Sequence, residues 1–396
     1  MEIGDAITSV DPAMIEVRVP GSRLKRKDAD IVKRRPQVTM IMKATRLCNL
    51  RCSYCNAWRE GPNQVMPMDV VERTTKEALQ LPWMRKVDFA WHGGETTLLK
   101  TDYFYRALEF QSKYRGDRIV ENIIQTNATL LDDKWISLFK DGNFQVGVSI
   151  DPPPERHARE RKTKGGRDSW QATIEGIRQL EAANIRYGAL VVVNEELLEY
   201  GAERFLACLH QYGLTSVGLL NVIPDNRDPS KKELNYLGWN RYVRFLIDVY
   251  AAKQDRYRHL RIRELDSLVD NIVKGVPSIC IYAGNCMGQY VTVETNGEVK
   301  ACDKYVYDNN YSFGELAASS LAEILTGPAV ASTRQEYFEQ LEPLKQCQYF
   351  KYCNGGCPHD QYLRRRVDSR TEIQCCGLEP LIEVMLRGHQ EQRAGQ

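Results

Sequence analysis

The 396-residue sequence lacks the features that place a protein in a membrane or on a nucleic acid. No apolar run approaches the roughly 20 residues that a membrane-spanning helix needs. The N-terminal segment MEIGDAITSVDPAMIEV carries acidic residues early and has no basic stretch followed by an apolar one, so it is not a signal peptide. The formal net charge is only +2, so nothing indicates bulk binding to nucleic acid or to a membrane. We therefore expect a cytoplasmic protein without either kind of partner.

The sequence also lacks internal repeats, low-complexity tracts and a glycine-rich phosphate loop of the G-x-G-x-x-G kind. Its hydrophobic content of 43% and charged content of 27% are ordinary for a globular protein, and its length suits two domains. Residues 1–36 are expected to form an N-terminal arm, because GSRLKRKDADIVKRR is basic and weakly periodic. A solvated tail is favoured there over a docking site for an acidic peptide.

Short apolar segments alternate with longer amphipathic ones from residue 37 onward. The predicted strands are QVTMIMKA (37–44), KVDFAW (86–91), IVENIIQT (119–126), QVGVSI (145–150), YGALVVV (187–193) and SVGLLNVI (216–223). The predicted helices are MDVVERTTKEALQL (68–81), YFYRALEFQSKY (103–114), DDKWISLFKDG (132–142), WQATIEGIRQLEAA (170–183) and AERFLACLHQYG (202–213). Such β–α repeats indicate an α/β fold with a parallel sheet, either open and doubly wound or curved into a partial barrel. In both cases the site belongs at the carboxyl ends of the strands.

The character of the sequence changes near residue 275. We expect the sheet domain over 37–235, a helical bridge over 236–275, a C-terminal module over 276–385 and a tail over 386–396. In the module, QYVTVETNGEVKACD predicts a β-hairpin, and its Asn296-Gly297 pair is typical of a type I′ turn.

Twelve cysteines in a chain without an export signal point to metal binding or catalysis rather than to disulfides. Three of them, Cys48, Cys52 and Cys55, have the spacing C-x3-C-x2-C directly after the first predicted strand. Three thiolates on one loop suit a cubane cluster with one iron left open, although a zinc site is the alternative. Cys208 is expected to be a core residue, and the remaining eight cysteines follow residue 279.

The segment CNLRCSYC resembles the signature of the radical S-adenosylmethionine (SAM) superfamily. That resemblance implies a partial (β/α)6 TIM-like barrel in which Cys48, Cys52 and Cys55 hold a [4Fe-4S] cluster. In the family the open iron chelates SAM, and one-electron reduction yields a 5′-deoxyadenosyl radical that abstracts hydrogen from the substrate. Tyr54, the aromatic residue before the last cysteine, would pack beside the adenine.

Two further motifs resemble SAM-binding segments of the family. In HGGE, Gly93, Gly94 and Glu95 match the motif that receives the SAM ammonium, with Thr96 where the family usually has proline. VSIDPPPERHARER matches the pattern S-x-D-G-P-x-x-x-H-x-x-x-R, with Pro152 in place of the glycine. The match implies that Ser149 contacts the ribose or carboxylate region of SAM and that Arg161 binds the carboxylate.

The C-terminal cysteines resemble those of a SPASM domain, a small iron–sulfur module with a β-hairpin and helices. The resemblance implies that a first auxiliary [4Fe-4S] cluster is ligated by the following four residues: Cys280, Cys286, Cys302 and Cys357. A second auxiliary cluster would use Cys347, Cys353 and Cys375, but the first cysteine of its pattern is replaced by Leu344. Adjacent Cys376 could supply a fourth thiolate; otherwise one iron stays open, or this half holds zinc or free thiols.

Asp303 follows Cys302 directly, and in sulfatase maturases the aspartate at this position is the expected base for the substrate residue. Beside an anionic cluster its pKa is expected to tend upward, and a hairpin-end carboxylate bound to backbone is the alternative. The resemblance to sulfatase maturases and peptide-cyclising enzymes implies oxidation or cross-linking of a peptide or protein side chain. It also implies an electron donor such as flavodoxin or ferredoxin. The alternatives are a dehydrogenase or epimerase of a sugar, aminocyclitol or other small metabolite, and a multi-cluster electron carrier or zinc-binding module.

Overall fold

The computed structural model describes residues 36–394 apart from 56, 58–63, 223–236, 255, 285, 306–307 and 367–373. Within this part of the chain a ten-stranded sheet has the order β12-β11-β10-β1-β3-β4-β5-β7-β8-β9, and β2 pairs with β6 in a second, small sheet. The strands are β1 (Gln37–Thr45), β2 (Leu50–Cys52), β3 (Lys86–Gly93), β4 (Ile119–Thr126), β5 (Phe144–Ser149), β6 (Arg161–Thr163), β7 (Tyr187–Val193), β8 (Ser216–Asn221), β9 (Arg261–Ile262), β10 (Tyr290–Val293), β11 (Glu298–Lys300) and β12 (Ser312–Glu315). The N-terminal arm lies outside the described residues, except for its last residue.

Helices connect most of these strands and build the C-terminal part of the chain. They are α2 (Met68–Leu79), α3 (Thr101–Tyr114), α4 (Asp133–Asp141), α5 (Pro154–Glu160), α6 (Trp170–Ala182), α7 (Glu195–Tyr200), α8 (Ala202–Gln211), α9 (Trp239–Lys253), α10 (Arg263–Lys274), α11 (Leu321–Thr326), α12 (Pro328–Leu341), α13 (Phe350–Cys353), α14 (Pro358–Arg366) and α15 (Glu379–Ala394). Short 3-10 turns include η1 (Thr96–Leu98), η3 (Cys280–Tyr282), η4 (Asp303–Tyr305), η5 (Asn309–Tyr311) and η6 (Pro343–Gln346). Among the described residues, none of the helices is both long and apolar enough to cross a membrane.

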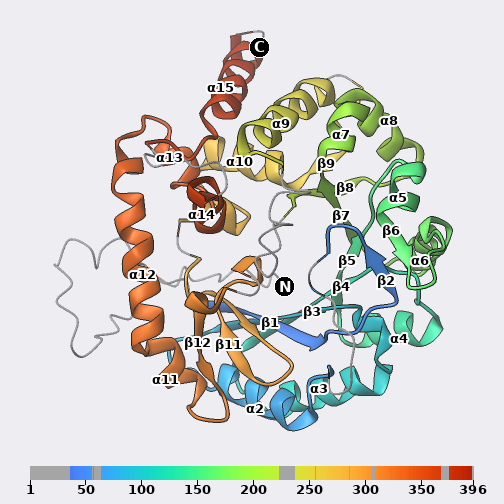
Figure 1. The fold of residues 1–396 in the computed structure, drawn as a ribbon, viewed down its shortest axis with the longest axis vertical. Coiled ribbons are helices and arrows are strands. Elements are labelled where there is room, and N and C mark those ends of the chain that lie inside the picture. Colours follow the sequence, from blue (N-terminus) through green and yellow to red (C-terminus); the bar gives the residue numbers. More distant parts are fainter. Residues whose placement is uncertain are drawn as a thin grey trace, which may run out of the picture.

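The six predicted strands are confirmed as β1, β3, β4, β5, β7 and β8, which are parallel neighbours in chain order. Helices cover the outer face of the curved sheet (Figure 1). Helix α4 illustrates why, since Asp132 caps its N-terminus and its apolar face buries Trp135 and Phe139. The fold is therefore the expected α/β partial barrel, and the carboxyl ends of its strands share one edge.

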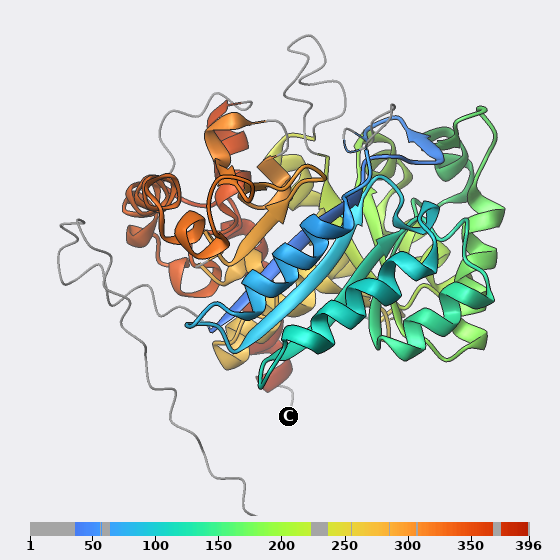
Figure 2. The same ribbon diagram turned by 90° about the horizontal axis from the view of Figure 1, so that it is seen from below.

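The hairpin of the C-terminal part continues the barrel sheet. Strand β10 runs parallel to β1, with Thr39 opposite Tyr290 and Met42 opposite Val293, while β11 and β12 extend the sheet outward. Helices α11 and α12, coloured orange, pack against β12 at this edge, whereas α15, in red, packs against α9 and α10 (Figures 1 and 2). The pairing gives hydrogen-bond partners to the outer backbone edge of β1, which would otherwise be unsatisfied in a buried strand.

The hairpin turn differs from the prediction. A type I′ turn needs positive φ at both central residues, but only Gly297 has it, with φ of 86°. Glu294 closes the turn, because its carbonyl accepts from Gly297 N at 2.9 Å and its N–H donates to Glu298 O at 2.9 Å. The type I′ prediction is therefore wrong, since this loop is longer and needs only one left-handed residue.

Candidate functional site

The loop of Cys48, Cys52 and Cys55 follows β1 at the carboxyl edge of the sheet. Its short strand β2 pairs antiparallel with β6, and Cys52 lies opposite Arg161 in that register. Neither three-residue strand was predicted, because neither shows an alternating pattern. The pairing brings the predicted SAM-binding arginine beside the predicted cluster ligands.

The chemistry of this thiol loop fits an iron–sulfur cluster. Backbone N–H groups point at two of the sulfurs, from Leu50 to Cys48 Sγ at 3.3 Å and from Ala57 to Cys55 Sγ at 3.4 Å. Burial raises the pKa of Cys48 to about 11 and that of Cys52 to about 12, so iron binding must displace thiol protons, and the neighbouring Arg161 favours the thiolates. In the described part of the chain, no three cysteine, histidine or carboxylate side chains converge as ligands of a single metal ion.

Gly93 and Gly94 let the end of β3 pack directly on the backbone of the thiol loop. A Cβ at Gly93 would lie 2.0 Å from Thr45 O, and one at Gly94 would lie 2.0 Å from Leu47 O. The same contact is sealed by hydrogen bonds from Gly94 N to Thr45 O and from Glu95 N to Leu47 O, both 2.7 Å. The two glycines therefore fix the position of the loop, and their contact with SAM stays a prediction.

The carboxylate of Glu95 is a buried brace between β3 and β4. Only 1% of the residue is exposed. Its Oε1 accepts from Thr97 N (3.1 Å), Thr97 Oγ1 (2.6 Å) and Thr126 Oγ1 (2.7 Å), and its Oε2 accepts from Asn127 N (2.7 Å). With four protein donors, this carboxylate organises the site, and its predicted role as acceptor of the SAM ammonium is untested.

The QTNAT segment after β4 holds the loop from the other side. Asn127 Nδ2 donates to Asn49 Oδ1 at 2.9 Å, and Asn49 Nδ2 donates to Thr129 Oγ1 at 2.8 Å. Asn49 is the residue after Cys48, so these amides fix the first thiol of the motif. The motif was noted in the sequence as a strand end, but its contact with the loop is visible only in the structure.

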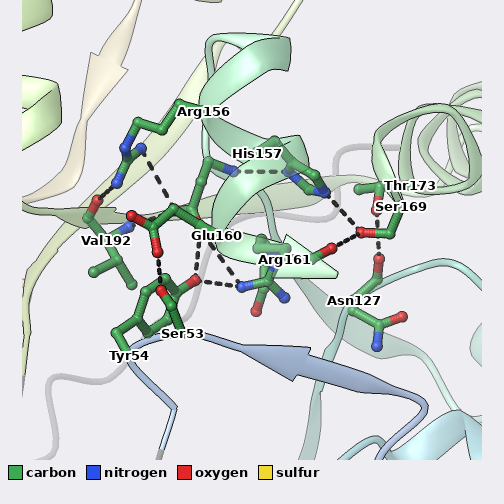
Figure 3. A network of polar contacts seen from close by, with 12 residues as sticks. Ser53, Tyr54, Asn127, Arg156, His157, Glu160, Arg161, Ser169, Thr173 and Val192 are labelled. Carbon is green, nitrogen blue, oxygen red and sulfur yellow. Dashed lines mark hydrogen bonds and ion pairs between the residues drawn. The ribbon is translucent and has the colours of Figure 1, made fainter. Parts of the chain in front are cut away.

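Arg161 joins a polar network with Tyr54 and Asp151. Arg161 Nη1 donates to Tyr54 OH at 2.6 Å, and Tyr54 OH donates to Asp151 Oδ2 (Figure 3). Only 7% of Arg161 is exposed, and its Nε is buried without a partner among the described residues. An unsatisfied buried guanidinium nitrogen suits an anionic ligand such as the SAM carboxylate. Ser149, at the end of β5, accepts from Gln125 Nε2 at 2.8 Å.

His157 supports this network from behind. Its Nδ1 accepts from Asp151 N at 3.2 Å, and its Nε2 lies 3.0 Å from Ser169 Oγ, which in turn donates to Arg161 O (Figure 3). Burial lowers the pKa of His157 to about 3, so the ring is neutral at physiological pH. His157 therefore positions the backbone of Arg161.

Asp303 meets two residues of the barrel that sequence reasoning did not assign. Lys43 of β1, only 1% exposed, donates from Nζ to Asp303 Oδ2 at 3.0 Å and to His92 Nδ1 at 2.9 Å. Burial would raise the pKa of Asp303, but Lys43, followed by His92, outweighs it and holds that pKa below its ordinary value. The expected upward tendency depends on the charge of an adjacent cluster and stays a prediction. A charged residue inside an apolar strand was the sequence signal for Lys43.

A second contact ties the thiol loop to the C-terminal hairpin. Arg46, two residues before Cys48, is nearly buried and donates from Nε to Glu294 Oε2 at 3.0 Å and from Nη1 to Ala57 O at 3.0 Å. Its Nη2 also contacts the Glu294 carboxylate. A bidentate arginine–carboxylate pair sets geometry as well as charge, so the hairpin turn orients the loop.

The four thiols predicted for the first auxiliary cluster come from η3, the adjoining loop, the end of β11 and the start of α14. They are mutually close enough that Cys280 and Cys357 each raise the pKa of Cys286 and Cys302, beyond the larger effect of burial. Lys304 Nζ lies 3.7 Å from Cys357 Sγ and 3.1 Å from Asp360 Oδ1. Four thiols with a partly buried cation beside them fit an anionic cluster.

The second predicted thiol set keeps three cysteines of its family pattern, and Cys376 lies beside them as a fourth thiol outside that pattern. Cys347 and Cys375 are close enough to hydrogen-bond to each other, and Cys353 contacts Cys376. Leu344 is buried at 2% exposure and is part of the hydrophobic core. Cys208 is likewise a core residue of α8, as predicted.

Two protein-family models match the chain, one over the barrel with its thiol loop and one over the C-terminal cysteines. The radical SAM superfamily matches residues 42–203, and SPASM, an iron–sulfur cluster-binding domain, matches residues 280–358. The chain belongs to the radical SAM superfamily and carries a SPASM domain. It is a radical SAM enzyme whose cofactors are SAM, its [4Fe-4S] cluster and one or two auxiliary clusters.

Curated relatives narrow the family further. The chain is 30% identical over 358 residues to the serine-type anaerobic sulfatase-maturating enzyme of Bacteroides thetaiotaomicron, covering 83% of this chain and 84% of that protein. It is 26% identical to the cysteine-type anaerobic sulfatase-maturating enzyme of Clostridium perfringens, covering 88% of this chain and 96% of that one. The chain is thus related to the anaerobic sulfatase maturases.

Solved structures share the fold. That of anSMEcpe with bound AdoMet matches with a TM-score of 0.76 at 23% identity, covering 88% of this chain and 96% of that chain. SuiB of Streptococcus suis, bound to the precursor peptide SuiA, matches with a TM-score of 0.59 at 14% identity, covering 82% and 73%. At such identities the likeness establishes a common architecture.

Proposed function

We propose that this radical SAM enzyme oxidises or cross-links a side chain of a peptide or protein, as a maturation step of that substrate. The observation that carries the proposal is the position of Asp303, which the C-terminal part of the chain places against Lys43 and beside His92 of the barrel. His92 directly precedes the glycine pair that packs on the thiol loop. The relatives support a peptide substrate, because two are sulfatase-maturating enzymes and SuiB was solved with a precursor peptide.

Oxidation of a serine or cysteine side chain removes a hydrogen atom from carbon, a proton from the hydroxyl or thiol, and one electron. When bound, SAM and the clusters supply the radical that takes the hydrogen atom and receive the electron. Asp303 accepts the proton, since its side chain is 27% exposed and Lys43 fixes its direction. A weak base suffices, because loss of the hydrogen atom makes the adjoining hydroxyl or thiol more acidic.

His92 orients the substrate beside this base. The Lys43 ammonium only donates, so the Nδ1 of His92 accepts and the neutral ring carries its proton on Nε2. Burial, followed by Lys43, lowers the pKa of His92 to about 4, which keeps the ring neutral. With 34% of its side chain exposed, His92 can present this N–H to a carbonyl or hydroxyl of the substrate.

The test is anaerobic reconstitution of the enzyme, followed by incubation with SAM, a reductant and peptides carrying a central serine or cysteine. We expect formation of 5′-deoxyadenosine and a mass change in the peptide, such as loss of two hydrogen atoms from a serine. A peptide with alanine at the target position and the Cys52→Ala enzyme are the controls. Deoxyadenosine formed with a sugar or aminocyclitol, and no modified peptide, would refute the peptide assignment in favour of a small-metabolite enzyme.

We also propose that the protein works in the cytoplasm and takes its electron from a flavodoxin or a ferredoxin. The many thiols support a reducing compartment, where disulfides are disfavoured. Replacing chemical reductant by flavodoxin, its reductase and NADPH should sustain deoxyadenosine formation. If neither a flavodoxin nor a ferredoxin supports any turnover, the assignment of the donor fails.

A further inference from the structure

The second thiol set departs from its family pattern at one position, and the structure shows how the departure is accommodated. Leu344 stands where that pattern has its first cysteine, in the turn η6 that follows α12. The side chain is buried among apolar residues, and a Cβ added at Gly355 would lie 3.4 Å from its Cδ1. A packed leucine offers no ligand atom, so only three thiols remain from the pattern.

Cys376 occupies the place of a fourth thiol. Its Sγ donates to Cys353 Sγ at 3.3 Å, and both residues are almost fully buried, at 3% and 2% exposure. Cys375 interacts with the thiols of both Cys376 and Cys347. The four sulfurs therefore form one contiguous group, which draws on the turn after η6, helix α13 and the segment before α15.

Two side chains of α14 fix the backbone of the vicinal pair. Arg364 Nη1 donates to Cys375 O at 2.7 Å, and Gln361 Nε2 donates to Cys376 O at 3.2 Å. Gly377 follows with φ of 87°, and its N–H donates to Cys375 Sγ at 3.3 Å. Because both carbonyls are held by α14, the two thiols are left facing their cysteine neighbours.

The surroundings explain why a thiol at this position would serve as a ligand. The group lies within the region that contains the other auxiliary thiols, and four thiolates form the ligand set of a [4Fe-4S] cluster. An N–H donor to Cys375 Sγ is the kind of contact that stabilises a cluster thiolate. A lone structural cysteine such as Cys208 has no comparable thiol neighbour.

We propose that Cys376, together with Cys347, Cys353 and Cys375, ligates a second auxiliary [4Fe-4S] cluster and replaces the cysteine that is absent at Leu344. The inference concerns metal binding and does not depend on the substrate. This inference can therefore fail while the proposed function holds, and the proposed function can fail while this inference holds.

The test counts iron and acid-labile sulfide in anaerobically reconstituted protein. We expect about twelve of each per wild-type chain, from three clusters of four. In a full-length background with Cys48, Cys52 and Cys55 changed to alanine, about eight should remain. Adding Cys376→Ala to that background should remove between about one iron and about four, and should change the electron paramagnetic resonance of the reduced protein. Cys208→Ala is the matched control and should change neither quantity.

Folding is checked separately in the otherwise wild-type chain. There, the Cys376→Ala protein should keep the spectral change that SAM causes in the cluster held by Cys48, Cys52 and Cys55. That result would show that the barrel and its SAM site are intact. An iron count and spectrum unchanged by Cys376→Ala would overturn the proposal. It would equally be overturned by zinc without sulfide at this site, or by a Cys353–Cys376 disulfide in the anaerobic protein.

Discussion

Glu95, which is buried, and Asp303, which is partly buried, are two acidic residues at the same edge of the sheet, and they differ in their hydrogen-bond and ion-pair partners. Glu95 is 1% exposed, and four neutral donors of the barrel bind its oxygens, three at Oε1 and one at Oε2. The Asp303 side chain is 27% exposed, and its charge is balanced by Lys43. A carboxylate whose acceptor sites are filled by protein serves architecture, whereas one that keeps an open face beside a fixed cation is available for chemistry.

The substitution Asp303→Asn tests most directly whether Asp303 serves chemistry rather than structure. The change removes the proton acceptor but keeps the size of the side chain, so peptide modification should fall about 100-fold or more. Thermal stability should fall modestly, because Lys43 loses its counter-charge but can still donate to the amide oxygen of the asparagine. Mass spectrometry of the peptide and a melting curve measure the two effects, with Asp117→Asn on the surface as control. A large loss of stability with retained activity would make Asp303 structural.

Glu95→Gln should have the opposite effect, lowering the stability of the fold more than the activity per cluster. One amide –NH2 would then face a backbone or hydroxyl donor inside the protein, which we expect to destabilise the fold by about 2 kcal/mol. Denaturant unfolding of the anaerobic protein measures this cost. Any loss of activity should follow the loss of cluster and disappear when rates are expressed per reconstituted cluster. A defect that persists per cluster would favour direct contact of Glu95 with SAM.

Substitutions of Lys43 test whether its ion pair with Asp303 matters for the reaction. Lys43→Met should lower peptide modification roughly 10-fold, equivalent to about 1.4 kcal/mol, because Asp303 and His92 lose their common donor. Lys43→Arg should recover part of that activity, since it keeps the charge. Rates at saturating peptide, and the peptide concentration at half saturation, separate positioning of the base from binding. Equal rates for Lys43→Met and wild type would show that the ion pair is dispensable.

The smallest expected effect is on the pH dependence of stability, and it comes from His157, a titratable residue that we do not expect the substrate to reach. Its folded pKa of about 3 lies below the unfolded value of 6.5, so the unfolded chain binds more protons between these values. The stability from neutral His157 is therefore complete above pH 6.5 and is lost as pH falls below it, by about 1 kcal/mol between pH 7 and 5.5. His157→Gln should flatten the pH dependence of unfolding over that interval. An equally steep dependence would assign the acid loss to other groups.

The six central strands and their helices could be read from the sequence because apolar periodicity reports burial. The short β2–β6 pair could not, since three residues carry no period and the pairing joins segments more than a hundred residues apart. The thiol spacings indicated clusters directly. Lys43 and Glu294 were missed because their partners, Asp303 and Arg46, lie about 250 residues away along the chain. The charge of Lys43 inside an apolar strand is a local signal, but the sequence does not show which distant residue is its partner.

The pairing of β10 with β1 has a consequence for synthesis of the protein. Until residue 293 has left the ribosome, the apolar strand β1 has a neighbour on one side only, and its other edge exposes unpaired backbone groups. A chain truncated at residue 275 would keep the whole barrel yet present this edge permanently. We expect such a fragment to aggregate, whereas the complete chain shields the edge with its own hairpin. The C-terminal part of the chain thus protects the edge of β1 from pairing with other chains.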